Sequence, residues 1–255
     1  MCGAFFSKKM NLLDGSNTVS LTEEIFIAYF ECRKNKRNTI NALAFEKHFE
    51  RNLFHLEEEI QNGYYNPGRS IAFIVNKPVK REIFAADFRD RVVHHWLINK
   101  LNPLFERIFI NDSYACRTGK GTHYGIQRLY NFISTCSNNY TTDCYILKLD
   151  VQGFFMHINR QLLYNRLKDF FLRYYHSSDK ALVLEISRKI IFNDPAKNCT
   201  IKGSRKDWEG LPQSKSLFYS PVGCGLPIGN LTSQVFANFY MNPFDWFVKK
   251  RNRYQ

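Results

Sequence analysis

The first seventy residues alternate between apolar and polar positions with the period of a helix. Apolar side chains recur at steps of two to four residues, at Leu43, Phe45, Phe49, Leu53, Leu56 and Ile60. This spacing places them along one face of an α-helix. Asn62 and Gly63 follow the stripe, and a glycine there can take the left-handed conformation that closes a helix. We therefore expect a helical segment up to about residue 70.

After a turn at residues 64–68, the period shortens to two. Residues 71–75 alternate as in a strand, and Lys77-Pro78 interrupts the pattern. Residues 81–84 resume it, and two such runs joined by a short polar break are typical of a β-hairpin. The sequence therefore predicts a hairpin with a basic tip.

A long helix is expected next, ending in a break at Pro103. Its apolar face would consist of Val92, Val93, Trp96, Leu97 and Leu101. Asp87 or Asp90 supplies the negative charge that favours the N-terminus of a helix.

The second half of the chain mixes strand, helix and loop patterns. Thr122 is a suitable N-cap for a helix that follows a basic, glycine-rich loop. Residues 145–149 alternate as a strand, and a helix is expected from about residue 158. Residues 194–222 are rich in Pro, Gly, Lys and Ser and predict a loop. A last helix is expected from about Leu231.

The net charge says more about the function than the overall composition does. Lys and Arg number 36 against 23 Asp and Glu, giving a net charge of +13 and a pI near 9.4. With 44% apolar residues, a disordered chain is excluded, and no apolar run approaches the roughly 18 residues of a membrane span. The excess of cations, accompanied by 23 Phe and 14 Tyr, favours a nucleic-acid partner over a merely lysine-rich surface. Charge does not separate an enzyme from a passive binder.

Cysteine usage and the N-terminal segment both indicate the cytoplasm. The seven cysteines are odd in number and include no CxxC pair, which argues against a disulfide framework or a zinc site. Reduced thiols fit better. Residues 1–15 lack the apolar core of a secretory signal.

One carboxylate has the setting of a metal ligand. Asp150 ends the predicted strand and is followed by Gly153 and the pair Phe154-Phe155. Mg²⁺ is held by one or two carboxylates together with substrate phosphates, and a strand end can present such a group. The alternative is an aspartate that caps a turn or a helix.

Four segments, in order, resemble the motifs of reverse transcriptases. LKLDVQGFF resembles the first catalytic motif, KREIFAADFRDRVVHHWL and DSYACRTGKGTH resemble two fingers motifs, and GLPIGNLTSQVFAN resembles the palm motif over the nascent base pair. The resemblance covers roughly residues 40–250. The palm motif reads PIG and SQ, where most bacterial members read PQG and SP. That pattern resembles the reverse transcriptases of diversity-generating retroelements.

The resemblance implies roles for particular residues. Asp150 would hold the metals with help from the Val151 carbonyl, and Phe155 would exclude the ribose 2′-OH. From the residues alone, a core aromatic is the commoner role for a residue such as Phe155. The implied nucleotide-binding residues are Lys80, Arg81, Arg117, Phe155, Ile228 and Gly229. The implied template- and primer-binding residues are Lys120, Asn230, Ser233 and Gln234.

The implied function is RNA-directed DNA synthesis. Such an enzyme copies template RNA into cDNA, with frequent errors at adenines during mutagenic retrohoming. Its partners would be template RNA, a cDNA primer end, deoxynucleotides and a small basic accessory protein, without a membrane. Its cofactor would be Mg²⁺ in a two-metal site.

The family's remaining catalytic carboxylates lie in an aromatic-x-Asp-Asp turn, and this chain contains no Asp-Asp pair. We expect an N-terminal part of an enzyme that does not polymerise alone and tends to aggregate through exposed strand edges. One alternative is a degenerate, non-catalytic RNA-binding protein. Another is a reverse transcriptase of a retron, a group II intron or a phage-defence system.

The expected fold class is α+β, with an incomplete right-hand polymerase arrangement. Residues 1–70 would form a helical lead-in, 71–140 the fingers, and 141–255 a partial palm with a loop insertion at 193–222. The palm would hold an antiparallel sheet packed on helices.

Overall fold

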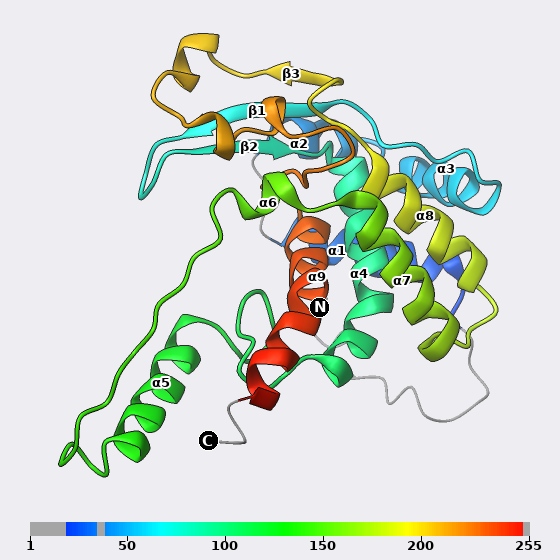
Figure 1. Ribbon diagram of the computed structural model, residues 1–255. Coiled ribbons are helices and arrows are strands. Elements are labelled where there is room, and N and C mark those ends of the chain that lie inside the picture. Colours follow the sequence, from blue (N-terminus) through cyan, green and yellow to red (C-terminus); the bar gives the residue numbers. More distant parts are fainter. Residues whose placement is uncertain (1–18, 35–38, 252–255) are drawn as a thin grey trace, which may run out of the picture.

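The computed structural model describes residues 19–34 and 39–251, which fold as a mixture of α-helices and one small sheet (Figure 1). The expectation about a secretory signal lies outside the described residues. The helices are α1 (Leu21–Arg33), α2 (Ile40–Glu46), α3 (Phe49–Gln61), α4 (Phe88–Ile108), α5 (Thr122–Cys136), α6 (Phe154–His157), α7 (Arg160–Tyr174), α8 (Lys180–Phe192) and α9 (Leu231–Arg251). The strands are β1 (Ser70–Val75), β2 (Arg81–Ala85) and β3 (Cys199–Ile201). Within the described ranges, every helix is too short or too polar to cross a membrane.

The predicted helical lead-in is confirmed as three helices. Ser20 caps α1 by accepting a hydrogen bond from the Glu23 backbone N–H at 3.2 Å. Gly63 closes α3 with a φ of 76°, as its position predicted. Leu43 departs from the predicted stripe, because its side chain is 55% exposed.

The predicted hairpin is also confirmed, and it forms two thirds of the sheet. β1 and β2 pair antiparallel, with Phe73 opposite Ile83. β3 adds to the other edge of β1 in parallel, with Ser70 opposite Cys199, so the strand order is β2-β1-β3. β3 lies in the segment expected to be a loop, which also contains three short 3₁₀ helices, η1 (Arg205–Trp208), η2 (Gln213–Lys215) and η3 (Leu217–Tyr219). The strand of three residues was too short to give a pattern of its own.

Helix α4 is the centre of the hydrophobic core. It packs against α1 on one side and α9 on another, where the Phe105 and Phe239 rings stack at 4.7 Å. Asp87 caps its N-terminus, as one of the two predicted candidates. The predicted break at Pro103 is wrong, because the helix continues to Ile108. A proline removes one backbone hydrogen bond, and the fully buried Leu101 and Phe105 on either side stabilise the helix through it.

Two other helix starts differ slightly from expectation. Thr122 is the first residue of α5, and Gly121 occupies the cap position without a side-chain bond, so Thr122 is not the cap. The helix expected from about residue 158 begins at Arg160, and Asn159 caps it by accepting a bond from Leu162 N–H at 2.8 Å. The last helix begins at Leu231 as predicted.

The strand predicted at residues 145–149 is not formed. The segment is extended and its apolar side chains are exposed, with Tyr145 at 90% and Leu147 at 82%. A strand needs a neighbour to pair its backbone groups, and no strand in the described ranges lies beside this one. Helix α5, which precedes it, buries none of its side chains. The two project from the rest of the molecule (Figure 1). The expected antiparallel palm sheet is therefore absent from the described residues, whose one sheet is mixed.

Candidate functional site

Asp150 lies at the end of the exposed extended segment, just before α6. Its side chain is exposed, and no described residue contacts it by a hydrogen bond or ion pair. The Val151 carbonyl accepts a bond from Phe154 N–H at 3.2 Å, which turns the chain into α6. Gly153 then has a φ of 62°, and a Cβ there would clash with the Ser214 carbonyl oxygen of η2. The turn at residues 151–153 therefore connects the exposed Asp150 to α6, which packs against η2.

The structure brings three of the predicted nucleotide-binding residues together beside β2. The Phe155 carbonyl accepts a bond from Leu226 N–H at 2.8 Å, and the Ile228 carbonyl accepts one from Phe84 N–H at 2.8 Å. Phe155 and Ile228 both pack against the small core over the sheet. Gly229 has a φ of 118°, and a Cβ there would lie 2.7 Å from the Ile83 side chain. A larger residue at 229 would therefore push the loop away from β2.

The two basic residues predicted to meet a triphosphate lie at the start of the same strand. Arg81 is the first residue of β2, and its side chain is exposed. Lys80 donates to the Glu209 carbonyl at 2.6 Å. That contact leaves the charge of the Lys80 ammonium unneutralised, since its partner is a neutral carbonyl.

Sequence reasoning missed Glu82, which is the most constrained acidic residue near this site. Its carboxylate is 1% exposed and accepts three hydrogen bonds, from Trp208 Nε1 at 2.6 Å, Ser216 Oγ at 2.7 Å and Leu217 N–H at 2.5 Å. A signal was present in the sequence, because Glu82 shares a strand face with Phe84, which faces the core. A buried carboxylate with three donors positions the segment that supplies them.

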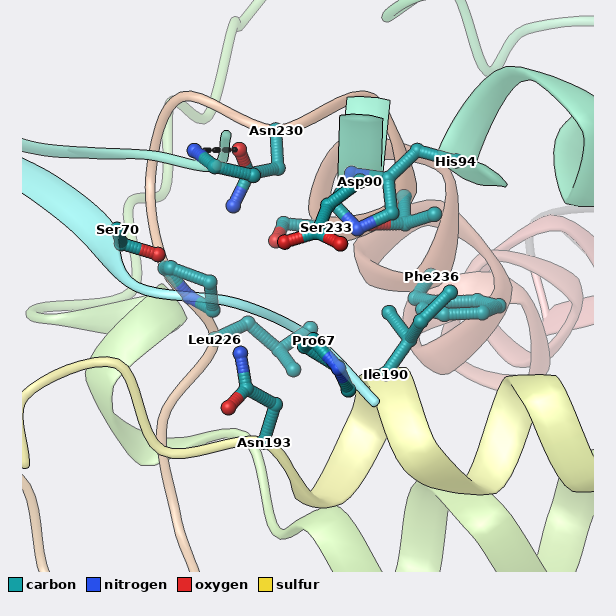
Figure 2. A pocket seen from close by; sticks show the side chains of 13 residues that line it. Pro67, Ser70, Asp90, His94, Ile190, Asn193, Leu226, Asn230, Ser233 and Phe236 are labelled. Carbon is teal, nitrogen blue, oxygen red and sulfur yellow. Dashed lines mark hydrogen bonds between the residues drawn. The ribbon is translucent and has the colours of Figure 1, made fainter. Parts of the chain in front are cut away.

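A small buried cavity lies beside the loop that leads into α9 (Figure 2). It is lined by polar side chains from α4 and the start of α9, among them Asp90, His94, Asn230 and Ser233. Its free volume is about 20 Å³, which is room for one water molecule. Asn230 Oδ1 accepts a bond from Ala86 N–H at 3.1 Å, which joins the loop to the end of β2.

The electrostatics of this cavity follow from burial. Burial lowers the pKa of His94 to about 3, and Nδ1 of this imidazole has no hydrogen-bond partner among the described residues. Burial also raises the pKa of Asp90, while a 2.8 Å bond from Gly68 N–H opposes the shift. The sequence analysis placed Asn230 and Ser233 at a template or primer; the structure buries both, at 5% and 3% exposure.

The remaining predicted binding residues lie in the loop before α5. Arg117 is 8% exposed, pairs with Glu106 at 2.6 Å and donates to the Ile110 and Ser113 carbonyls at 2.7 Å each. Lys120 donates to the Asn111 carbonyl at 2.8 Å. Both side chains therefore hold the loop in shape, and within residues 19–34 and 39–251 no hydrogen bond or ion pair joins either to β2.

Gln234 completes the predicted set. Its Oε1 lies 3.2 Å from Cys116 Sγ, so it joins the loop before α5 to α9. The roles predicted for Arg117, Lys120 and Gln234 in nucleic-acid contact stay predictions.

The acidic residues do not fit a two-metal site. In the part of the chain that the structure describes, no three His, Cys, Asp or Glu side chains gather as a metal site would require. Two-metal catalysis uses ions about 3.5–4 Å apart, held by several carboxylates. Asp150 is a single exposed carboxylate, so no catalytic step through a metal follows from these residues.

Comparisons with known proteins give distant similarities. No family model matches the chain. Protein YkfC of Escherichia coli strain K12 is 22% identical over 198 residues, which are 77% of this chain and 45% of YkfC. Two solved structures, a partial Cas6-RT-Cas1–Cas2 complex and a Cas6-RT-Cas1–Cas2 complex, each cover 91% of this chain at 18% identity and a TM-score of 0.46. This chain covers 36% and 22% of those chains, so it spans less than half the length of all three proteins.

Proposed function

We propose that this chain carries the nucleotide-binding part of an RNA-directed DNA polymerase. The observation that supports the proposal most is that Phe155 and Ile228 pack against one small core that includes Phe84 of β2, while Gly229 lies close to Ile83 of the same strand, whose first residue is Arg81. These residues come from three separate motifs of the sequence, and their meeting at one strand is what a shared substrate would require. The corresponding ligand is a deoxynucleoside triphosphate.

The proposed roles follow from the chemistry of each side chain. Arg81, with Lys80 beside it, would neutralise the triphosphate, because a guanidinium matches phosphate oxygens in a fork. Phe155 would exclude the ribose 2′-OH by its bulk. Ile228 and Gly229 would lie beside the nascent base pair, and Arg117, Lys120, Asn230, Ser233 and Gln234 would support template and primer.

We further propose the diversity-generating type of reverse transcriptase. An Ile at position 228 replaces a side chain that could form hydrogen bonds near the incoming nucleotide. Apolar pockets reject wrong ligands less strongly than polar ones, so errors at template adenines would follow. The proposed setting is the cytoplasm, with template RNA, a cDNA primer end and a small basic accessory protein as partners.

Catalysis needs more carboxylates than Asp150. Mg²⁺ is the proposed cofactor of the complete active site, where Asp150 and the Val151 carbonyl would be ligands. We propose that the 255 residues alone bind nucleic acid without extending a primer. A degenerate RNA-binding protein is the second candidate, favoured by the exposure of Asp150 without an acidic neighbour in the described structure.

Photolabelling tests the nucleotide site without requiring catalysis. The chain would be irradiated with 8-azido-dATP in the presence of an RNA template and DNA primer, and the labelled peptides identified by mass spectrometry. We expect label in peptides that contain Phe155 or Ile228, and about tenfold less label in Arg81→Gln. Lys168→Gln, an exposed cation on α7, is the matched control. Label spread evenly over the surface, or unchanged by Arg81→Gln, would overturn the nucleotide site.

A further inference from the structure

A second feature of the molecule is a rigid basic surface beside the hairpin. The chain after β3 runs over one face of the β1–β2 hairpin and returns through η1, η2 and η3 (Figure 1). Lys202 N–H donates to the Ala72 carbonyl at 2.9 Å, and Trp208 and Leu217 pack over the sheet. The nucleotide proposal gives this segment, residues 202–219, no role.

Glu82 holds this segment in place. Its three hydrogen bonds reach the side chains of Trp208 and Ser216 and the backbone of Leu217, so one buried carboxylate fixes η1 and η3 together. Lys80 adds a bond to the Glu209 carbonyl from the hairpin side. Because the anchors are buried and the hairpin is regular, the exposed side chains of the segment stand on a fixed support.

The charged side chains of this surface are mostly cations without acidic partners. None of them forms an ion pair within the described ranges of the chain: Lys77, Lys80, Arg81, Lys202, Arg205, Lys206 and Lys215. Against these seven stand three carboxylates, giving a local formal charge of +4. Glu82 is buried, and Asp207 accepts a bond from Ser204 N–H at 2.8 Å. Only Glu209 has no assigned hydrogen-bond partner for its carboxylate among the described residues.

Many other cations of this protein are neutralised. Arg33 pairs with Glu46, Lys100 with Glu24 and Asp179, and Arg128 and Lys249 with Asp112. Unpaired cations also occur elsewhere in the described chain, for example on α7 and α8. The seven of this surface stand on a support fixed by buried contacts, and such a fixed cluster of positive charge suits a polyanionic ligand.

We propose that this surface, the basic platform of residues 202–215 with the hairpin tip, binds the phosphodiester backbone of single-stranded RNA. Arg205 lies 4.6 Å above the Phe218 ring, and the next residue, Tyr219, is 62% exposed. Phe218 is half-buried, so Tyr219 is the ring of this pair that a base could stack on, beside cations that would pair with phosphates. The choice of RNA rests on the proposed function. Of the residues assigned to the triphosphate under that function, the platform shares only Lys80 and Arg81.

The experiment compares two triple variants in one binding assay. Lys202→Gln, Arg205→Gln and Lys206→Gln remove three platform cations whose side chains form no hydrogen bond or ion pair in the described chain. The matched control removes Lys168, Arg173 and Lys180 of α7 and α8, which also make no ion pair in the described chain. Binding of a fluorescent 20-nucleotide oligo(U) RNA is measured by anisotropy from 50 to 200 mM salt, after unfolding curves show that all proteins are folded.

We expect the platform variant to bind about tenfold more weakly at 100 mM salt, while the control changes less than twofold. The slope of log K against log[salt] should fall by about 2, because each phosphate contact to a single strand contributes roughly 0.7. Equal losses in both variants would mean diffuse charge and would overturn the platform. Binding to phosphatidylserine vesicles that depends on the same cations, without RNA binding, would overturn it in favour of a membrane surface.

The assay separates this proposal from the nucleotide site. Photolabelling and RNA binding are measured on the same proteins, so failed photolabelling with RNA binding intact would count against the nucleotide site alone. Loss of RNA binding in the platform variant with normal photolabelling supports two distinct surfaces. Unchanged RNA binding in the platform variant overturns the platform alone.

Discussion

The Glu82 carboxylate accepts a hydrogen bond from the Trp208 indole at 2.6 Å, across 126 residues of chain. The same carboxylate accepts bonds from Ser216 and Leu217, so the hairpin and the segment that follows β3 fold as one unit. This unit carries the exposed cations and also packs against Phe155 and Ile228. The small sheet therefore organises both proposed binding surfaces.

Removing the Glu82 carboxylate should destabilise the protein strongly. Glu82→Ala would leave three donors without their acceptor, two of them buried, which costs about 3–5 kcal/mol. Urea unfolding followed by tryptophan fluorescence measures this loss. Glu58→Ala, an exposed carboxylate on α3 without an assigned partner, should change the free energy of unfolding by about 0.5 kcal/mol or less. Similar values for the two variants would contradict the role of Glu82.

Protonation of His94 should make the protein less stable in mild acid. Its pKa is about 3 when folded and near 6.5 when unfolded, so the unfolded chain binds the extra proton between these values. Stability therefore falls as pH drops below 6.5, by about 2 kcal/mol at pH 5 from this group.

Urea unfolding of the wild type and His94→Gln at pH 7 and pH 5 isolates that effect, since Asp90, Arg91 and His95 are present in both. The variant should lose about 2 kcal/mol less on acidification than the wild type. The same loss in both proteins would show that His94 is already protonated or exposed in the folded state.

The exposed extended segment should drive self-association. Leu147 is 82% exposed in a run with unpaired backbone groups, which is a template for pairing with another chain. Leu147→Lys should lower the concentration-dependent light scattering of the purified chain several-fold. Leu172→Lys, on the exposed side of α7, is the control and should leave scattering unchanged. Equal scattering from wild type and Leu147→Lys would place the association surface elsewhere.

The side chain at position 228 should influence fidelity. We expect Ile228→Gln, made in a complete enzyme that contains this chain, to reduce misincorporation opposite template adenines, because an amide adds hydrogen bonds that discriminate between bases. Sequencing of cDNA made on a defined RNA template measures the change. Error rates at template uridines serve as the internal reference. An unchanged adenine error rate would contradict the role proposed for Ile228.

Local patterns were enough to predict most of the helices and the β1–β2 hairpin. The hairpin followed from alternation and a proline break within fifteen residues, and α9 from the apolar run after Asn230. The sequence analysis missed what depends on distant partners. β3 pairs with β1 over more than a hundred residues, and its three residues have no pattern of their own.

At residues 145–149 the error is the reverse, because a strand was predicted and none is formed. The alternation of apolar residues is typical of a strand, but pairing requires a second strand that the described chain does not place there. For the site, sequence motifs predicted Phe155, Ile228 and Gly229, which the structure brings together. They did not predict the structural role of Glu82, because that role depends on hydrogen bonds from Trp208, Ser216 and Leu217, which are distant in the sequence.

Primer extension tests the central claim most directly. The complete coding frame that contains these 255 residues would be expressed and assayed on an RNA template with a DNA primer, alongside Asp150→Asn and the control Lys168→Gln. The account predicts deoxynucleotide incorporation by the wild type and the control, and a loss of at least about a hundredfold in Asp150→Asn. Incorporation that survives Asp150→Asn, or none by the wild type with intact RNA binding, would contradict it.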